Sequence, residues 1–161
     1  SLAYGKLVTR ALRHVAFIKP DLIVLCDDLA APEPANFQFM LHALNPFEVD
    51  AGKSRLTVEG PKAGVAAQYL PPVPLAFRQW DGFTPKPRKE FPNQWHVEAG
   101  TRDKRAELRM LTVLAPYRAG KRIEWTADRV ESETAVGARI KHGGEMTTVA
   151  FRKSNAASAA S

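Results

Sequence analysis

The sequence contains little of what several protein classes require. Its 161 residues include a single cysteine, Cys26, so no disulfide can form within the chain and a hydrophobic core must stabilise the fold. No run of about eighteen apolar residues occurs, which excludes a membrane-spanning helix. Gly-x-Ser-x-Gly, Cys-x-x-Cys, His-Glu-x-x-His and the glycine-rich nucleotide-binding motifs are also missing. Several common enzyme classes therefore lose their usual support.

The amino-terminal residues lack the features of an export signal. Residues 1–14 have no apolar core, and lysine and arginine interrupt them. The sequence does not begin with methionine and starts in a strand-like pattern. We therefore interpret the chain as a piece of a longer protein, whose route of export its own terminus does not indicate.

The composition is that of an ordinary globular domain with a basic surface. Charged residues make up 25% and hydrophobic residues 45% of the chain, and the length suits one domain. The net charge is +6 and the isoelectric point is about 9.7. An excess of positive charge favours anionic partners, and an acidic polysaccharide fits as well as nucleic acid does.

Short segments of alternating apolar and polar residues follow one another throughout, separated by turn residues. This pattern predicts an all-β fold, an antiparallel β-sandwich of about ten strands over residues 1–153. Gly143-Gly144 is the clearest hairpin turn. Residues 111–115 are apolar on both faces, which predicts a strand between two packed layers. The Ala/Ser-rich residues 154–161 are predicted to be a disordered tail.

Two histidines and an aspartate in the first three predicted strands are candidate metal ligands. If Pro20 and Asp21 form a two-residue hairpin loop, His14 lies opposite Asp27. His42, in the third predicted strand, joins them if that strand is a neighbour. Two imidazoles and a carboxylate suit zinc. The alternative is a His–Asp pair that only secures the hairpin, with His42 elsewhere.

Two blocks of residues resemble the carboxyl-terminal β-domain of the heparinase II/III-like polysaccharide lyases. The first block is Arg13-His14-Val15-x-Phe17-x-x-Pro20-Asp21, Val24-x-x-Asp27-x-Leu29 and Phe37-x-Phe39-x-Leu41-His42. The second block is Trp95-His96-Val97 and Leu111-Thr112-Val113-Leu114-x-Pro116. Together they cover most of the chain in the expected order.

The resemblance implies a function that the chain performs only as part of a longer protein. Enzymes of this family cleave uronic-acid polysaccharides by β-elimination, and an α/α-toroid domain before the β-domain supplies the main catalytic Tyr and His. No toroid lies in this sequence, and the segment Thr9-Arg10-Ala11-Leu12 lacks the histidine that some relatives carry there. We therefore expect no catalytic residue in this chain, and an isolated chain without activity. The family also implies a periplasmic or secreted location.

The family's β-domain zinc, where present, is held by His, Asp and His. Carried over residue by residue, the resemblance assigns a structural zinc to His14, Asp27 and His42, with Asp28 as the substitute if the hairpin register differs.

The proline-rich residues 71–92 are the best candidate for a polysaccharide-binding loop. Prolines exclude a central strand there. Aromatic rings that can stack on sugars alternate with cations that can pair with carboxylate or sulfate. The predicted substrate-binding residues are Trp80, Arg78, Lys86 and Arg88. The alternative is an irregular connection held in place by its own aromatic side chains. His96 is interpreted as a surface imidazole, with a ligand contact as the other possibility.

Two further functions compete with the lyase domain. The same sandwich would also suit a stand-alone carbohydrate-binding or adhesion module. Nucleic-acid binding rests on the positive charge alone.

Overall fold

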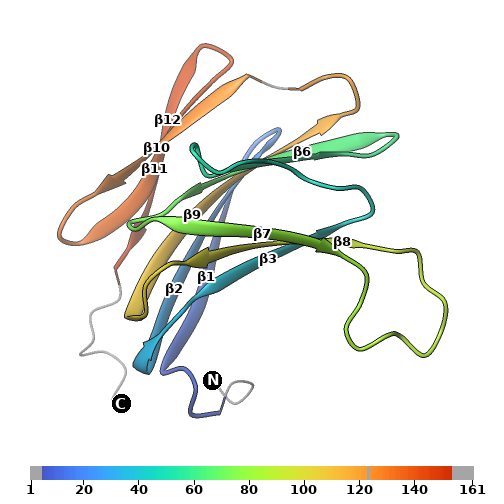
Figure 1. Cartoon of the computed structure of the whole chain (residues 1–161). Helices are drawn as coiled ribbons and strands as arrows, with labels where there is room; N and C mark the ends of the chain where they lie inside the picture. The colour runs from blue at the N-terminus through green and yellow to red at the C-terminus, as the bar shows by residue number, and fades with distance from the viewer. Residues whose placement is uncertain (1–4, 123, 154–161) are drawn as a thin grey trace.

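The computed structural model describes residues 5–122 and 124–153, and they form an all-β fold (Figure 1). Its strands are β1 (Arg10–Ile18), β2 (Leu22–Ala35), β3 (Gln38–Ala43), β4 (Glu48–Asp50), β5 (Arg55–Glu59), β6 (Ala63–Leu70), β7 (Leu75–Asp81), β8 (Trp95–Thr101), β9 (Arg105–Arg118), β10 (Trp125–Glu131), β11 (Ala135–His142) and β12 (Glu145–Arg152). The predicted all-β class is confirmed. None of the described residues lies in a helix long and apolar enough to cross a bilayer.

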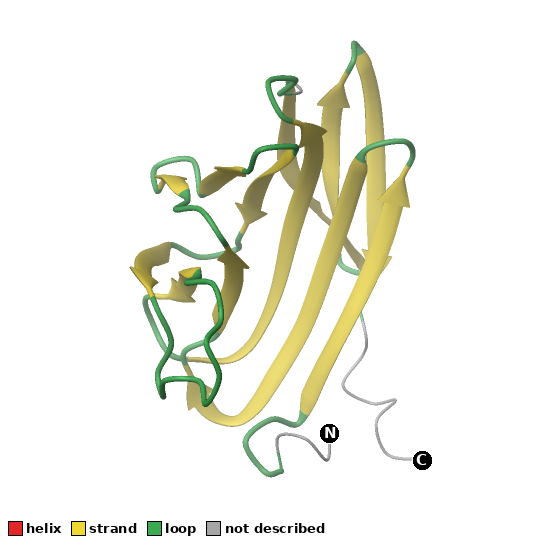
Figure 2. Cartoon of the chain, turned by 90° about the vertical axis from the view of Figure 1, so that its right-hand side faces the viewer, coloured by secondary structure: helices red, strands yellow, loops and turns green. Residues whose placement is uncertain are grey.

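Three antiparallel sheets are stacked in layers (Figure 2). The central sheet has the strand order β1-β2-β9-β6-β5-β4. The β10–β12 sheet, in the order β10-β11-β12, packs on one face of the central sheet. The β3–β8–β7 sheet, in the order β3-β8-β7, packs on the other face. Two separate cores result, one on each face of the central sheet.

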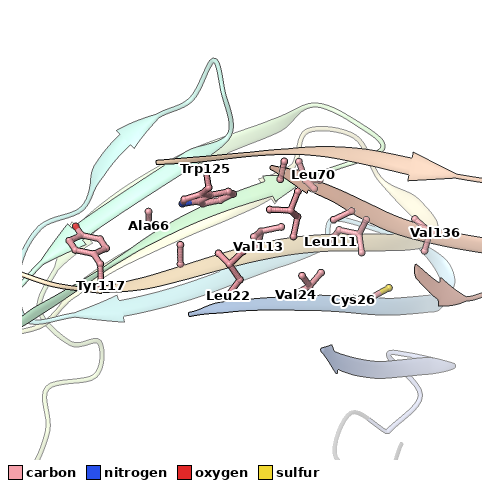
Figure 3. Close-up of a cluster of buried hydrophobic side chains, with 14 residues drawn as sticks. Leu22, Val24, Cys26, Ala66, Leu70, Leu111, Val113, Tyr117, Trp125 and Val136 are labelled. Carbon is pink, nitrogen blue, oxygen red and sulfur yellow. The ribbon is translucent and has the colours of Figure 1, made fainter. Parts of the chain in front are cut away.

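Strand β9 shows why the central sheet can carry a core on both faces. Leu111 and Val113 point into the core shared with the β10–β12 sheet, where Figure 3 shows them with Leu22 and Trp125. Met110, which directly precedes Leu111, points into the core shared with the β3–β8–β7 sheet. Successive side chains of a strand alternate between faces, so a continuous apolar run suits a doubly covered strand. The prediction from residues 111–115 is confirmed.

The hairpin between β1 and β2 has a different register from the predicted one. Strand β1 ends at Ile18 and β2 begins at Leu22, so three residues form the turn instead of two. This shift by one residue places Cys26 opposite His14 and Asp27 opposite Arg13. A one-residue change of register alters every cross-strand pair, so the predicted His14–Asp27 pair is wrong.

Two strands lie in proline-containing stretches of the sequence. Strand β2 continues through Pro32 and Pro34 to Ala35, and its pairing with β9 shifts register between Ala30 and Ala35. Strand β7 lies within residues 71–92, where the sequence excluded a central strand. It contains no proline and pairs only with β8, at the edge of its sheet, so the flanking prolines interrupt no ladder.

The last three strands form a meander that contains the predicted Gly143-Gly144 turn. Strands β10, β11 and β12 pair in sequence, and Gly143 and Gly144 form the last turn with φ angles of 57° and 84°. Positive φ at both central residues is what a tight hairpin turn of this kind requires. The predicted tail, residues 154–161, lies outside the described residues.

Candidate functional site

The three predicted zinc ligands lie on three different surfaces. The His14 ring contacts Phe151 of β12, with 6.0 Å between the ring centroids. Asp27 lines a groove on the opposite side of the central sheet, between β1 and β3. His42 lies next to His96, with ring centroids 4.5 Å apart. The structure therefore does not bring the three residues together.

Asp27 instead forms a two-point ion pair with Arg13. The Arg13 Nε and Nη2 atoms donate to the two carboxylate oxygens, at 2.5 and 2.9 Å. The Asp27 side chain is only 6% exposed, so a charged partner is required to offset its desolvation. The substitute ligand Asp28 is also engaged, at 2.9 Å from Arg10 Nε and 3.3 Å from Arg109 Nε.

The predicted zinc set does not fit this arrangement. Both candidate carboxylates face guanidinium groups, which compete with a cation for the same oxygens. Within residues 5–122 and 124–153, no three His, Cys, Asp or Glu side chains lie close enough to hold a metal ion.

Cys26 is a packing residue. Its side chain is buried in the core beneath the β10–β12 sheet. Burial first, and then the negative charges of Asp28 and Asp27, raise the pKa of its thiol to about 11. A thiol with so high a pKa carries little thiolate near neutral pH, so Cys26 is a poor nucleophile.

An aromatic row crosses the outward face of the β3–β8–β7 sheet, and we define it as His42, His96 and Trp80. His96 lies directly opposite His42 on β3 and directly opposite Trp80 on β7. Its ring stacks on Trp80 with 5.4 Å between centroids and 12° between planes, and it meets His42 edge to face. Neighbours such as Val97 point the other way, into the core.

His96 is buried, contrary to the surface interpretation. It is 7% exposed, although it lies on the outward face of its sheet. Phe83, from the loop after β7, also contacts its ring edge to face, with 5.7 Å between centroids. The alternation of Trp95 and Val97 correctly indicates the outward face, but only tertiary structure shows that neighbouring rings cover the imidazole.

Arg78 lies beside the aromatic row. Its guanidinium carbon is 4.5 Å from the centroid of the Trp80 ring, and its Nη2 atom is 3.1 Å from a Glu98 carboxylate oxygen. These contacts hold an exposed cation in a defined position. Trp80 contacts both Arg78 and His96, and these contacts take up π surface that a stacked sugar ring would need. Two of the predicted binding residues are thus adjacent, with Trp80 supporting Arg78.

The loop that joins β7 to β8, residues 82–94, carries the other two predicted binding residues. It projects away from the sheets (Figure 1). The loop and Asp81 line an open cavity of ≈ 610 Å³. Lys86, Arg88 and Lys89 line it together with Phe91. The loop therefore combines three cations with aromatic surface, and the Phe83–His96 contact attaches its start to the aromatic row.

The fold is that of part of the heparinase III structures. No family model and no curated protein sequence matches the chain. Among solved structures, the Heparinase III-BT4657 gene product superimposes with a TM-score of 0.69 at 13% identity over 89% of this chain. The heparan sulfate lyase HepC from Pedobacter heparinus gives a TM-score of 0.67 at 14% identity over 90% of the chain. Identities this low show a shared fold.

The chain spans about a quarter of the length of these solved proteins, namely 24% of each of the two. A further heparinase III structure gives a TM-score of 0.65 at 12% identity and is covered over 23% of its length. These matches agree with the β-domain that the sequence resemblance implied.

Proposed function

We propose that the chain is the β-domain of a heparinase II/III-like polysaccharide lyase. In a longer chain with an α/α-toroid, this domain would take part in the cleavage of a uronic-acid polysaccharide by β-elimination. The observation that carries the proposal is the fold shared with heparinase III structures over about nine-tenths of the chain. The sequence blocks around Arg13 and Trp95 support the same assignment independently of the superposition.

The chemistry of the elimination explains why the domain would depend on a partner domain. Removing a proton next to a carboxylate requires a group that neutralises that carboxylate, a base that works near neutral pH and an acid for the leaving sugar oxygen. We propose that the toroid supplies these groups, while this domain contributes binding surface. Because such polysaccharides occur outside the cytoplasm, we also propose a periplasmic or secreted location.

We propose that the loop of residues 82–94 and the neighbouring Arg78 bind the anionic polysaccharide. The net charge of +6 favours an anionic partner, and the cavity places Lys86 and Arg88 within one open site. Each cation can pair with a sulfate or carboxylate, and Arg78 can do so in a position held by Trp80 and Glu98.

Heparin affinity chromatography tests this binding site. The Lys86→Ala/Arg88→Ala variant is expected to elute at clearly lower salt than the unmodified chain, since it loses two cations from one site. The matched control, Arg118→Ala/Lys121→Ala, removes the same charge from the exposed end of β9 and the turn that follows it, and should elute nearer to the unmodified chain. Equal shifts for the two variants would show that heparin binding depends only on the net charge of the chain. The loop would then not be the binding site.

A stand-alone carbohydrate-binding module is the second candidate, favoured by the cavity in the loop. The two functions differ in what precedes the domain in its gene. A long helical region immediately upstream supports the lyase, and purified protein containing both parts should then release unsaturated sugar products from a uronic-acid polysaccharide. Unrelated repeats upstream, together with heparin binding and no product, would favour the module.

A further inference from the structure

We propose that His42 and His96 form a two-imidazole binding site for a late first-row divalent metal ion, such as Zn²⁺ or Cu²⁺. The site lies on the outward face of the β3–β8–β7 sheet and does not depend on the proposed function. It shares His42 with the zinc set predicted from the sequence, but neither His14 nor Asp27. The other coordination positions would be taken by water.

The backbone register brings the two imidazoles together. His42 and His96 are direct cross-strand partners on β3 and β8, so their side chains leave the same face of the sheet. Their ring centroids are 4.5 Å apart. Two imidazoles on one ion, with metal–nitrogen distances of about 2.0–2.1 Å, have centroids separated by roughly 4.5–5.2 Å for bond angles of about 90–110°. The observed separation lies at the lower end of that range, and because the two rings meet edge to face at 84°, the exposed His42 ring would turn to direct its nitrogen at the ion.

The buried imidazole has a nitrogen available for a ligand. His96 Nε2 is buried and has no hydrogen-bond partner among the described residues. A buried polar atom without a partner is uncommon, and a metal ion would satisfy this nitrogen. The Trp80 ring stacked on His96, and Phe83 at its edge, restrict the orientation of the imidazole. A restricted ring loses less entropy when it binds an ion.

Solvent reaches the pair on the side of His42, whereas His96 Nε2 itself is buried. His42 is exposed, so the site opens to solvent on its side. The nearest carboxylate along β8, Glu98, is paired with Arg78. Imidazole nitrogens bind zinc, copper and nickel ions well, whereas calcium and magnesium ions require oxygen ligands. The ligand set therefore predicts copper bound at least as tightly as zinc, with no response to calcium.

Tryptophan fluorescence provides a direct readout, because Trp80 stacks on one of the proposed ligands. Copper bound at His96 is expected to quench Trp80 emission as Cu²⁺ is titrated into the 161-residue chain, prepared without a histidine tag. Calorimetry with Zn²⁺ should give about one ion per chain. The Trp80→Phe variant should retain the calorimetric binding and lose most of the quenching. Trp95, next to His96, can account for a small remaining signal, but quenching in Trp80→Phe as strong as in the unmodified chain would place the ion elsewhere and overturn the proposal.

Histidine variants identify the ligands. His42→Ala changes an exposed side chain and should lower the zinc affinity at least about tenfold, since changes to outer-shell partners alone cost about 10–100-fold. His96→Gln should do the same, provided that its circular dichroism matches that of the unmodified chain. The control His14→Ala, on another surface, should bind normally. Unchanged affinity in His42→Ala, loss of affinity in His14→Ala, or no metal bound to the unmodified chain would each refute the site.

Discussion

Replacing Arg13 with alanine should destabilise the domain, because Arg13 is the partner of a buried carboxylate. The Asp27 side chain is 6% exposed, and Arg13 bonds both of its oxygens. Removing one member of a buried ion pair costs about 3–5 kcal/mol. The Arg13 side chain is 58% exposed, so solvent screens part of the interaction. We therefore expect a loss of roughly 1–3 kcal/mol in the free energy of unfolding.

Urea unfolding, followed by circular dichroism, measures this loss. The midpoint should fall while the m-value stays constant, and a loss of about 2 kcal/mol corresponds to a melting temperature lowered by roughly 4–8 °C for a chain of this size. The matched control is His14→Ala, the neighbouring position in β1. His14 is exposed and faces Phe151, so its loss should cost no more than about 0.5 kcal/mol.

A double-mutant cycle decides between the two possible registers of the hairpin. Combining each change with Asp27→Asn should give a coupling energy of about 1 kcal/mol or more for Arg13 and close to zero for His14. A larger coupling between His14 and Asp27 would refute the reasoning, because it would require the register that the sequence predicted.

Two further predictions concern the interior of the fold. Gly137→Ala should lower the free energy of unfolding by at least about 2 kcal/mol, because an added Cβ would overlap the Val149 backbone oxygen. The control Gly100→Ala should cost much less, since the nearest atom to its added Cβ is 3.5 Å away. Similar urea midpoints for the two variants would contradict this prediction. Cys26 should react slowly with a disulfide reagent at pH 8 in the folded chain, since burial raises its pKa from an ordinary 9.0 to about 11. The neutral thiol's contribution to stability is complete below about pH 9 and is lost as the pH rises through about 11. Between these pH values the urea midpoint of Cys26→Ala should therefore decrease less than that of the unmodified chain.

The sequence by itself determined the fold class and most of the strands. Alternation of apolar and polar residues has a period of two in any strand, wherever that strand lies, so the all-β class could be predicted from local sequence alone. The doubly apolar run at residues 111–115 also indicated a covered central strand. Local turn chemistry was sufficient at Gly143-Gly144, where two positive φ angles are needed.

Only the tertiary structure decided which residues meet. The β1–β2 turn has one residue more than predicted, and this single difference replaced His14 with Arg13 opposite Asp27. The pairing of His96 with both His42 and Trp80 depends on strands far apart in the chain being neighbours in one sheet. Alternation shows which side chains share a face of one strand, but not which strand lies beside it. That choice depends on packing across the whole molecule, and the candidate sites follow from it.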